Sequence, residues 1–206
     1  MARLCREFYL RPTLETARAL LGKCLVRRLE DEILAVRITE TEGYIGRCDK
    51  ACHAYGCRRT PRTDTMFRRG GTAYIYFIYG MYHCLNFVTE PEGEPAAVLI
   101  RSAEPLAGEE TIRRLRFGDR PLTADRRRNF LNGPGKLCKG LCLTRDQNGL
   151  DLVTGEDLFC CDGPEDLGLP PSAPVRERIR CGPRIGVDYA EEARDFPWRF
   201  WLEKEE

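Results

Sequence analysis

The stretch TAYIYFIYGMYHCLNFVT, residues 72–89, decides the fold. The residues up to Tyr79 and those from Tyr82 onward are rich in aromatic and β-branched side chains, which favour strands. Gly80-Met81 between them is typical of a tight turn. The stretch therefore predicts a β-hairpin that carries four tyrosines within nine residues, with Tyr79 at its tip.

Further strands and helices are predicted on both sides of this hairpin. The strands are expected at residues 23–29, 33–41, 96–103, 185–187 and 199–202. The helices are expected at residues 11–21, with Thr13 as the cap, at 107–117 and at 133–143. Three segments have an irregular pattern: residues 43–71, 118–130 and 151–174. Long irregular loops in a compact domain are usually functional or disordered.

The size and composition indicate one globular domain that spans residues 1–206. No run approaches the roughly 18 apolar residues of a membrane span. The first six residues lack the apolar core of a signal peptide, so a cytoplasmic protein is expected. The 11 cysteines are an odd number without an export signal, and reduced thiols are expected.

The charge is nearly balanced, with a net charge of +1, but it is unevenly distributed. Arginines, which outnumber lysines 28 to 5, gather at residues 58–69, 113–128 and 176–184, and acids at 151–166 and 203–206. Such separation can present a positive face to phosphates, for which the arginine fork is suited. Genome composition bias with solvated helix faces explains the pattern equally well.

The segment ETEGY, residues 40–44, ends the second predicted strand. Because side chains of a strand alternate between faces, Glu40, Glu42 and Tyr44 point the same way. A carboxylate beside aromatic rings can take a proton from water and hold its oxygen near an electrophilic carbon. Two solvated acids at a strand end are the more common meaning of a bare Glu-x-Glu.

Two metal sites are alternatives. A metal-dependent hydrolase would use Glu40, Glu42, Asp49 and His53. A zinc site would use Cys48, Cys52, His53 and Cys57, but this spacing departs from the common Cys-x2-Cys pattern and no distant pair completes it. We therefore predict no metal.

The tyrosine hairpin also has two interpretations. An aromatic strand most often belongs to a core, but Tyr79 at a hairpin tip is poorly placed for one. An exposed aromatic residue suits stacking on a base, and enzymes that act on a base within a duplex must extrude it. A non-catalytic nucleic-acid binding module would keep the same hairpin.

Eight short motifs in order identify a family. They are RALLG (18–22), ETEGY (40–44), TPR (60–62), MF (66–67), YIYFIYGMY (74–82), LIRSAEPL (99–106), GPGKLC (133–138) and RIGV (184–187). With them the chain resembles the alkyladenine DNA glycosylases, also called 3-methyladenine or methylpurine DNA glycosylases, as a bacterial-type member. The resemblance runs from about Arg6 to Phe200.

The resemblance implies a mixed α/β (α+β) fold: a single domain with a curved, largely antiparallel sheet, surrounding helices and a protruding β-hairpin. It implies a monofunctional glycosylase that flips out alkylated purines and excises them from duplex DNA in base excision repair. Its substrates would be 3-methyladenine and 7-methylguanine, with hypoxanthine and ethenoadenine as further candidates. No cofactor is expected, and the partner would be double-stranded DNA with a damaged purine, bound by a monomer in the cytoplasm beside the nucleoid.

The resemblance also assigns roles to residues. The catalytic residues would be Glu42, which deprotonates the attacking water, Arg101, which helps to hold that water, and Ile185, through its backbone carbonyl. The flipped base would be enclosed by Tyr44, His53 and Tyr76, with Asn86 disfavouring the exocyclic amine of guanine. DNA would be contacted by Tyr79, inserted into the duplex, and by Met81, Tyr82, Arg62 and Lys136.

The chemistry agrees with these roles. N-alkylation makes a purine cationic, and aromatic faces attract a cation. Apart from Lys50, no lysine lies near the acid strand or the hairpin in the sequence, which favours water over a Schiff base and base removal without strand cleavage. One departure is Gly43, where alanine is common in the family.

Overall fold

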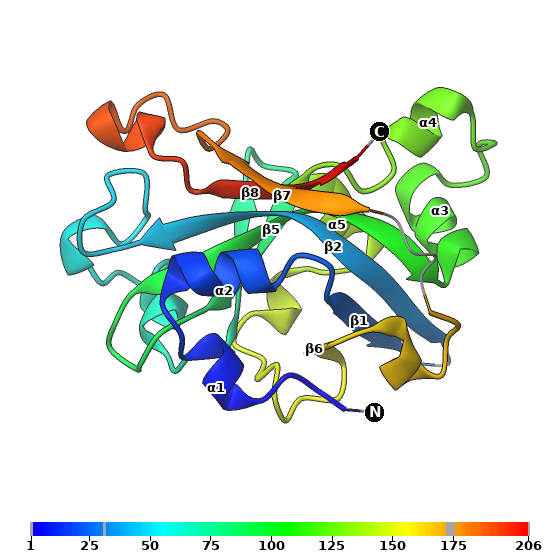
Figure 1. Cartoon of the computed structure of the whole chain (residues 1–206), viewed down its shortest axis with the longest axis horizontal. Helices are drawn as coiled ribbons and strands as arrows, with labels where there is room; N and C mark the ends of the chain where they lie inside the picture. Colours follow the sequence, from blue (N-terminus) through cyan, green and yellow to red (C-terminus); the bar gives the residue numbers. More distant parts are fainter. Residues whose placement is uncertain (1, 31, 172–175, 206) are drawn as a thin grey trace.

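The tyrosine hairpin and the acid-bearing strand belong to one open, antiparallel sheet in the computed structural model of the chain, which describes residues 2–30, 32–171 and 176–205 (Figure 1). Within these residues the sheet has eight strands: β1 (Cys24–Leu29), β2 (Glu32–Ile45), β3 (Ala73–Ile78), β4 (Tyr82–Val88), β5 (Ala96–Ala107), β6 (Leu158–Cys161), β7 (Glu177–Gly182) and β8 (Arg199–Lys204). Their order is β3-β4-β5-β2-β1-β6, with β8 pairing with both β2 and β7.

Short helices complete this α+β domain. The α-helices of the described residues are α1 (Arg6–Tyr9), α2 (Thr13–Ala19), α3 (Glu109–Phe117), α4 (Ala124–Arg128) and α5 (Pro134–Gly140). The 3-10 helices are η1 (Tyr55–Cys57), η2 (Asp64–Phe67), η3 (Arg145–Gln147), η4 (Pro164–Leu167) and η5 (Glu191–Asp195). The predicted fold class, an α+β domain around a largely antiparallel sheet, is confirmed.

The alternation along β5 separates the core from the functional side of the sheet. Val98 and Ile100 are fully buried in the main hydrophobic core, to which α2 and α5 also contribute. The intervening residues Ala97, Leu99 and Arg101 line a cavity instead. Side chains of a pleated strand alternate between its two faces. Arg101 therefore points to the same side as Leu99, toward the cavity, whereas Ile100 points into the core.

The hairpin and β1 lie where the sequence predicts them, but three strands run further than predicted, among them β8, which continues past residue 202 to Lys204. β2 continues past Thr41 to Ile45, because its end pairs with the start of β5, as in Ile45 opposite Ala96. β5 continues to Ala107, so helix α3 begins only at Glu109. Glu42 therefore lies within a strand that has neighbours on both sides, β5 and β8, and not at a strand end.

Several other predictions were wrong in detail. Thr13 does not cap α2 but begins it, and its hydroxyl bonds the Thr89 side chain at 2.9 Å. Residues 185–187 form no strand, because Gly186 has a φ of +77° and Ile185 is exposed. Three segments expected to be irregular contain elements: β6 in 151–174, α4 in 118–130, and η1 and η2 in 43–71. The sequence did not predict α1 or β7.

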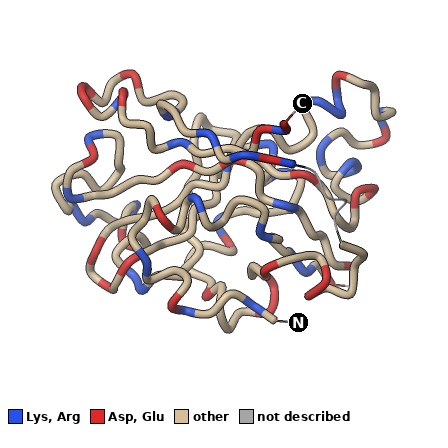
Figure 2. The backbone as a smooth tube through the Cα atoms, viewed as in Figure 1, with Lys and Arg blue, Asp and Glu red and all other residues tan. Residues whose placement is uncertain are grey.

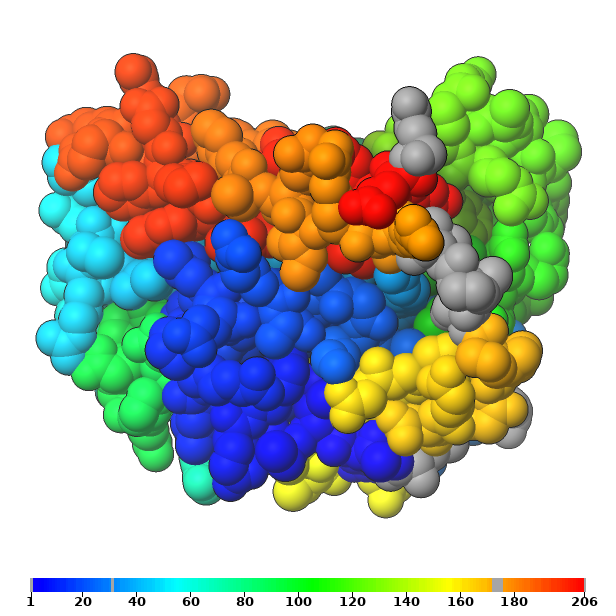
Figure 3. Space-filling model, viewed as in Figure 1, coloured from blue at the N-terminus to red at the C-terminus, as the bar shows by residue number. Residues whose placement is uncertain are grey.

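Acidic and basic residues are mixed along the backbone, and in the view of Figure 2 neither positive nor negative charge predominates. In the arginine-rich region around α3 and α4, several arginines pair with acids close by in the chain: Arg113 with Glu110, Arg127 with Glu109, and Arg128 with Asp125. The space-filling view shows a hollow between two raised lobes at the upper edge, one around η5 and one around α3 and α4 (Figure 3). None of the helices described is long and apolar enough to cross a bilayer.

Candidate active site

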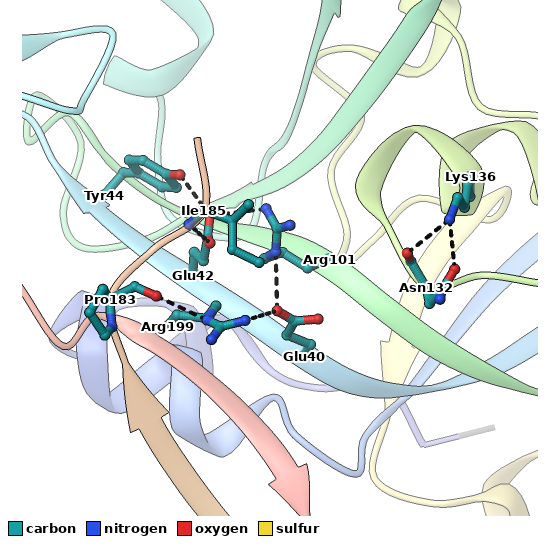
Figure 4. Close-up of polar contacts among 9 residues, drawn as sticks. All are labelled: Glu40, Glu42, Tyr44, Arg101, Asn132, Lys136, Pro183, Ile185 and Arg199. Atoms are coloured by element: carbon teal, nitrogen blue, oxygen red, sulfur yellow. Dashed lines mark hydrogen bonds and ion pairs between the residues drawn. The ribbon is translucent and has the colours of Figure 1, made fainter. Parts of the chain in front are cut away.

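Glu42 is the centre of the site, with a side chain that is 0% exposed. One carboxylate oxygen, Oε1, accepts the backbone N–H of Ile185 at 2.8 Å. The other, Oε2, accepts the hydroxyl of Tyr44 at 2.7 Å and a guanidinium N–H of Arg101 at 3.3 Å (Figure 4). Three donors from β2, β5 and the loop after β7 therefore fix one buried carboxylate.

The donors around Glu42 keep their protons. Burial raises the pKa of the Tyr44 hydroxyl well above its ordinary value, and the adjacent Glu42 carboxylate raises it further. Burial opposes the charge of Arg101, but the carboxylates of Glu42 and Glu40 outweigh it and raise the pKa of the guanidinium. Both acids of the ETEGY segment thus reach Arg101, as expected for residues that share one face of a strand.

A cavity of about 520 Å³ adjoins this cluster. Its aromatic lining comes from Tyr44, His53, Tyr74, Tyr76, Tyr79, Tyr82 and Tyr189. Asn86, Arg101 and Ile185 also line it, so every residue assigned to base binding borders one space. Sequence reasoning missed Tyr74 and Tyr189, although Tyr74 lies in the hairpin motif and Tyr189 follows RIGV by two residues.

His53 and Tyr76 form one wall of the cavity. Their ring centroids are 4.6 Å apart at an interplanar angle of 77°, an edge-to-face arrangement, and His53 Nδ1 lies 3.2 Å from the Tyr74 hydroxyl. Loss of water around the imidazole inside the cavity, reinforced by the nearby Arg62, lowers the pKa of His53 to about 4, although the residue as a whole is exposed. His53 is therefore neutral at pH 7. The Arg62 guanidinium lies over the Tyr76 ring, 5.4 Å from its centroid.

Asn86 lies on β4, directly opposite Tyr74 on β3. Its side chain is buried, and its amide nitrogen donates to the backbone carbonyls of Tyr74 at 3.1 Å and Cys84 at 3.3 Å. These two bonds fix the plane of the amide against the sheet. The orientation of Asn86 in the cavity wall is thus set by the backbone of β3 and β4.

The mouth of the cavity is built differently. Tyr79 is 79% exposed and has a φ of +54°, in the left-handed region that most residues avoid, and Gly80 follows with a φ of +67°. Met81 and Tyr82 beside it are also exposed. A Cβ on Gly135 would lie 2.8 Å from the Tyr82 ring, so a glycine is required where α5 meets the hairpin.

The sequence indicates Lys50 as the one lysine near the acid strand and the hairpin, but the lysine that lies beside the cavity is Lys136. Lys136 borders the cavity, whereas Lys50 is bound by Glu191 and Glu192. Lys136 lies near the hairpin because α5 packs against β4, a contact that distance in sequence does not reveal. Its ammonium donates to the side-chain oxygens of Asn129 and Asn132, each at 2.9 Å, and burial with the nearby Arg116 lowers its pKa.

Neither metal alternative is supported by the geometry. Asp49 forms a two-pronged ion pair with Arg184, and both side chains are fully buried. Arg184 also donates to the carbonyls of Gly43 at 2.9 Å and Ala193 at 3.0 Å, so this pair ties the loop before Ile185 to the end of β2. In the part of the chain that the structure describes, no three His, Cys, Asp or Glu side chains could hold a metal ion, and all 11 cysteines are free thiols.

Comparison with known proteins agrees with this geometry. Residues 7–206 match the family model described as Methylpurine-DNA glycosylase. A relative from Methanocella arvoryzae is 50% identical over 198 residues, 96% of this chain and 91% of the relative, and one from Clostridium perfringens strain SM101 is 46% identical over 202 residues, 97% and 95%. Both carry the name "Putative 3-methyladenine DNA glycosylase". The chain therefore belongs to the methylpurine-DNA glycosylase family, hydrolases that act on N-glycosidic bonds.

Proposed function

We propose that this glycosylase flips alkylated purines such as 3-methyladenine out of duplex DNA and hydrolyses their glycosidic bond with a water activated by Glu42. The observation that carries the proposal is the buried Glu42 carboxylate beside an aromatic cavity. A carboxylate offers about four acceptor sites, and three are occupied by Tyr44, Arg101 and Ile185. The remaining site is the place for one water.

The proposed chemistry follows from the charges of the reactants. An alkylated purine is cationic and leaves with little help from a general acid, so the sugar becomes oxocarbenium-like. A carboxylate beside C1′ stabilises that positive charge and accepts the proton of the attacking water. In this scheme Arg101 and the Ile185 N–H orient the carboxylate, whereas the resemblance assigns Ile185 a role through its carbonyl.

The cavity walls suit the proposed ligand. Tyr44, Tyr76 and His53 present aromatic faces and edges, and cations bind aromatic faces. The low pKa of His53 supports the same ligand, because a neutral imidazole does not repel a cationic base. Asn86 would act at the edge of the base.

The proposed partner is double-stranded DNA with a damaged purine, bound by a monomer in the cytoplasm. Tyr79 would occupy the gap that the flipped nucleotide leaves, and Met81, Tyr82, Arg62 and Lys136 would contact the DNA around it. The exposure of Tyr79 supports this role, because the residues that the structure describes leave 79% of it uncovered. Binding should weaken with salt, since cationic side chains would contact phosphates.

An excision assay in the presence of a chelator tests the proposal. Methylated genomic DNA and a duplex with one hypoxanthine would be incubated with wild type, Glu42→Gln and the control Glu203→Gln, which removes a carboxylate bound to two arginines at the far end of β8. We expect wild type and Glu203→Gln to release base from methylated DNA and Glu42→Gln to release none. Release by Glu42→Gln at the wild-type rate would overturn the role of Glu42. Release from methylated DNA alone would indicate a cavity that selects cationic bases.

A further inference from the structure

Glu40, the other acid of the ETEGY segment, is bonded to two arginines. Its Oε1 accepts the Nε–H of Arg101 at 3.2 Å and an N–H of Arg199 at 3.2 Å (Figure 4). Its side chain is 20% exposed and lines a groove beside β8, not the aromatic cavity. Glu40 therefore cannot touch a base in that cavity, but it touches a residue that can.

Arg199 extends this network to the loop that supports Glu42. It lies directly opposite Glu42 in the β2–β8 pairing, and its Nε donates to the carbonyl of Pro183 at 3.0 Å. Pro183 lies two residues before Ile185, whose N–H binds Glu42. Through Arg101 and Arg199, Glu40 is thus connected to two of the three donors that hold the Glu42 carboxylate.

We propose that Glu40 is a positioning residue, which keeps Arg101 and the loop at residues 183–185 in the arrangement that leaves Glu42 one free acceptor site. The inference rests on the proposed function of Glu42. An arginine prefers to bind one carboxylate with two parallel N–H groups. Glu40 holds the Nε of Arg101, so that only one N–H reaches Glu42.

The consequence of losing Glu40 follows from this geometry. Without the negative charge at residue 40, the Arg101 guanidinium is free to turn and bind Glu42 with two N–H groups. That pairing would fill the acceptor site that the water needs. At the same time Arg199 would lose the partner that holds it against Pro183. The chemical step should slow, whereas the aromatic cavity and the hairpin should bind DNA as before.

The test separates the chemical step from binding. Single-turnover excision from methylated DNA and the Kd for a lesion duplex would be measured for wild type, Glu40→Gln and the control Glu203→Gln. We expect Glu40→Gln to lower the single-turnover rate by roughly 10- to 100-fold, because displacing a reacting group by about 1 Å costs on that order. The Kd and the melting temperature should remain near the wild-type values, and Glu203→Gln should match wild type throughout.

A second variant keeps the inference falsifiable if Glu40→Gln loses stability. Arg199→Gln should also slow excision, and the double variant should be no slower than the slower single one, because the two residues act through one network. If the rate losses of Glu40→Gln and Arg199→Gln multiply in the double variant, the two residues act independently and the proposed network is overturned. A wild-type rate for folded Glu40→Gln would overturn the inference alone. Excision by Glu42→Gln at the wild-type rate would instead overturn the proposed function.

Discussion

The two ends of the cavity differ in how firmly their side chains are held. At the inner end the Glu42 carboxylate is fully buried and bonded by three donors. At the mouth the Tyr79 ring is mostly exposed on the three-residue turn between β3 and β4, in which Tyr79 and Gly80 have positive φ angles. Groups that perform chemistry benefit from being fixed in advance, because no reorganisation is then required during the reaction. A side chain that must enter a duplex has to be left without partners in its own protein.

The same difference has an energetic side. A buried charge is costly unless it is paired and hydrogen-bonded, so the charged groups at the inner end need partners of opposite charge. Glu42 with Arg101, and Asp49 with Arg184, meet this condition. An exposed aromatic ring forgoes some hydrophobic burial until DNA covers it. The inner end should therefore respond to mutation by losing catalysis or stability, and the mouth by losing affinity.

The largest expected effect is that of Glu42→Gln on the chemical step. The amide keeps the shape of the side chain but cannot take a proton from water, and general bases contribute about 10²- to 10⁴-fold. We expect a loss of single-turnover excision on that scale or larger, with the Kd for a lesion duplex nearly unchanged. A loss of DNA binding equal to the loss of rate would show that the two ends of the cavity are not separable.

The next effect is on stability, through the ion pair that supports the inner end. Asp49→Ala leaves the buried guanidinium of Arg184 without its carboxylate, and breaking such a pair costs about 3–5 kcal/mol. In a domain of this size a loss of that order lowers the melting temperature by roughly 10 °C. Calorimetry would measure the shift, with Glu94→Gln as the control, because the Glu94–Arg47 pair lies at the surface. Equal melting temperatures for Asp49→Ala and wild type would contradict the supporting role of the pair.

Much of the fold was predictable because its signals are local. The hairpin, β1 and β8 carry apolar or aromatic patterns of strand length with turn residues beside them. β7 was missed because its sequence ERIRCG is charged and mostly exposed, so no alternation reveals it. β6 was missed because LFCC is only four residues long within an acidic, Gly- and Pro-rich segment. The true ends of β2 and β5 follow from pairing with each other, which a single segment does not encode.

The residues of the site likewise fall into those that local motifs predict and those that only the tertiary structure reveals. The motifs group Glu42, Arg101 and the tyrosines of the hairpin in one site, and these residues lie on neighbouring strands of one sheet, with Arg101 and the tyrosines lining the cavity. The residues that support this site from behind, Arg184 and Arg199, were not predictable, since each comes from a distant part of the chain. Arg199 is 159 residues from Glu40, and Arg184 is 135 residues from Asp49. The sequence alone makes Asp49 a candidate metal ligand, because its ion-pair partner Arg184 is not apparent from the local sequence.

At the mouth, Tyr79→Ala should weaken the binding of a lesion duplex by roughly 1–3 kcal/mol, the scale of a lost base stack. Tyr79→Phe keeps the ring and should bind like wild type. Fluorescence anisotropy at several salt concentrations would measure the Kd. Tyr55→Ala is the matched control, because Tyr55 is also an exposed tyrosine but does not line the cavity. Equal losses for Tyr55→Ala and Tyr79→Ala would remove the special role of the hairpin tip.

The smallest effect concerns His53, which lies between the two ends. Its pKa of about 4 is below the ordinary value of 6.5, so the unfolded chain takes up a proton first as the pH falls. The free energy of unfolding should therefore be undiminished by this group above pH 6.5 and should decrease between pH 6.5 and about 4. In His53→Asn the free energy of unfolding should decrease less over this pH range. Solvent that reaches the His53 ring through the cavity makes the difference between wild type and His53→Asn small. An NMR titration of His53 would measure its pKa. A value near 6.5 would contradict the prediction, because a cationic imidazole would then face the cavity at mildly acidic pH and repel a cationic base.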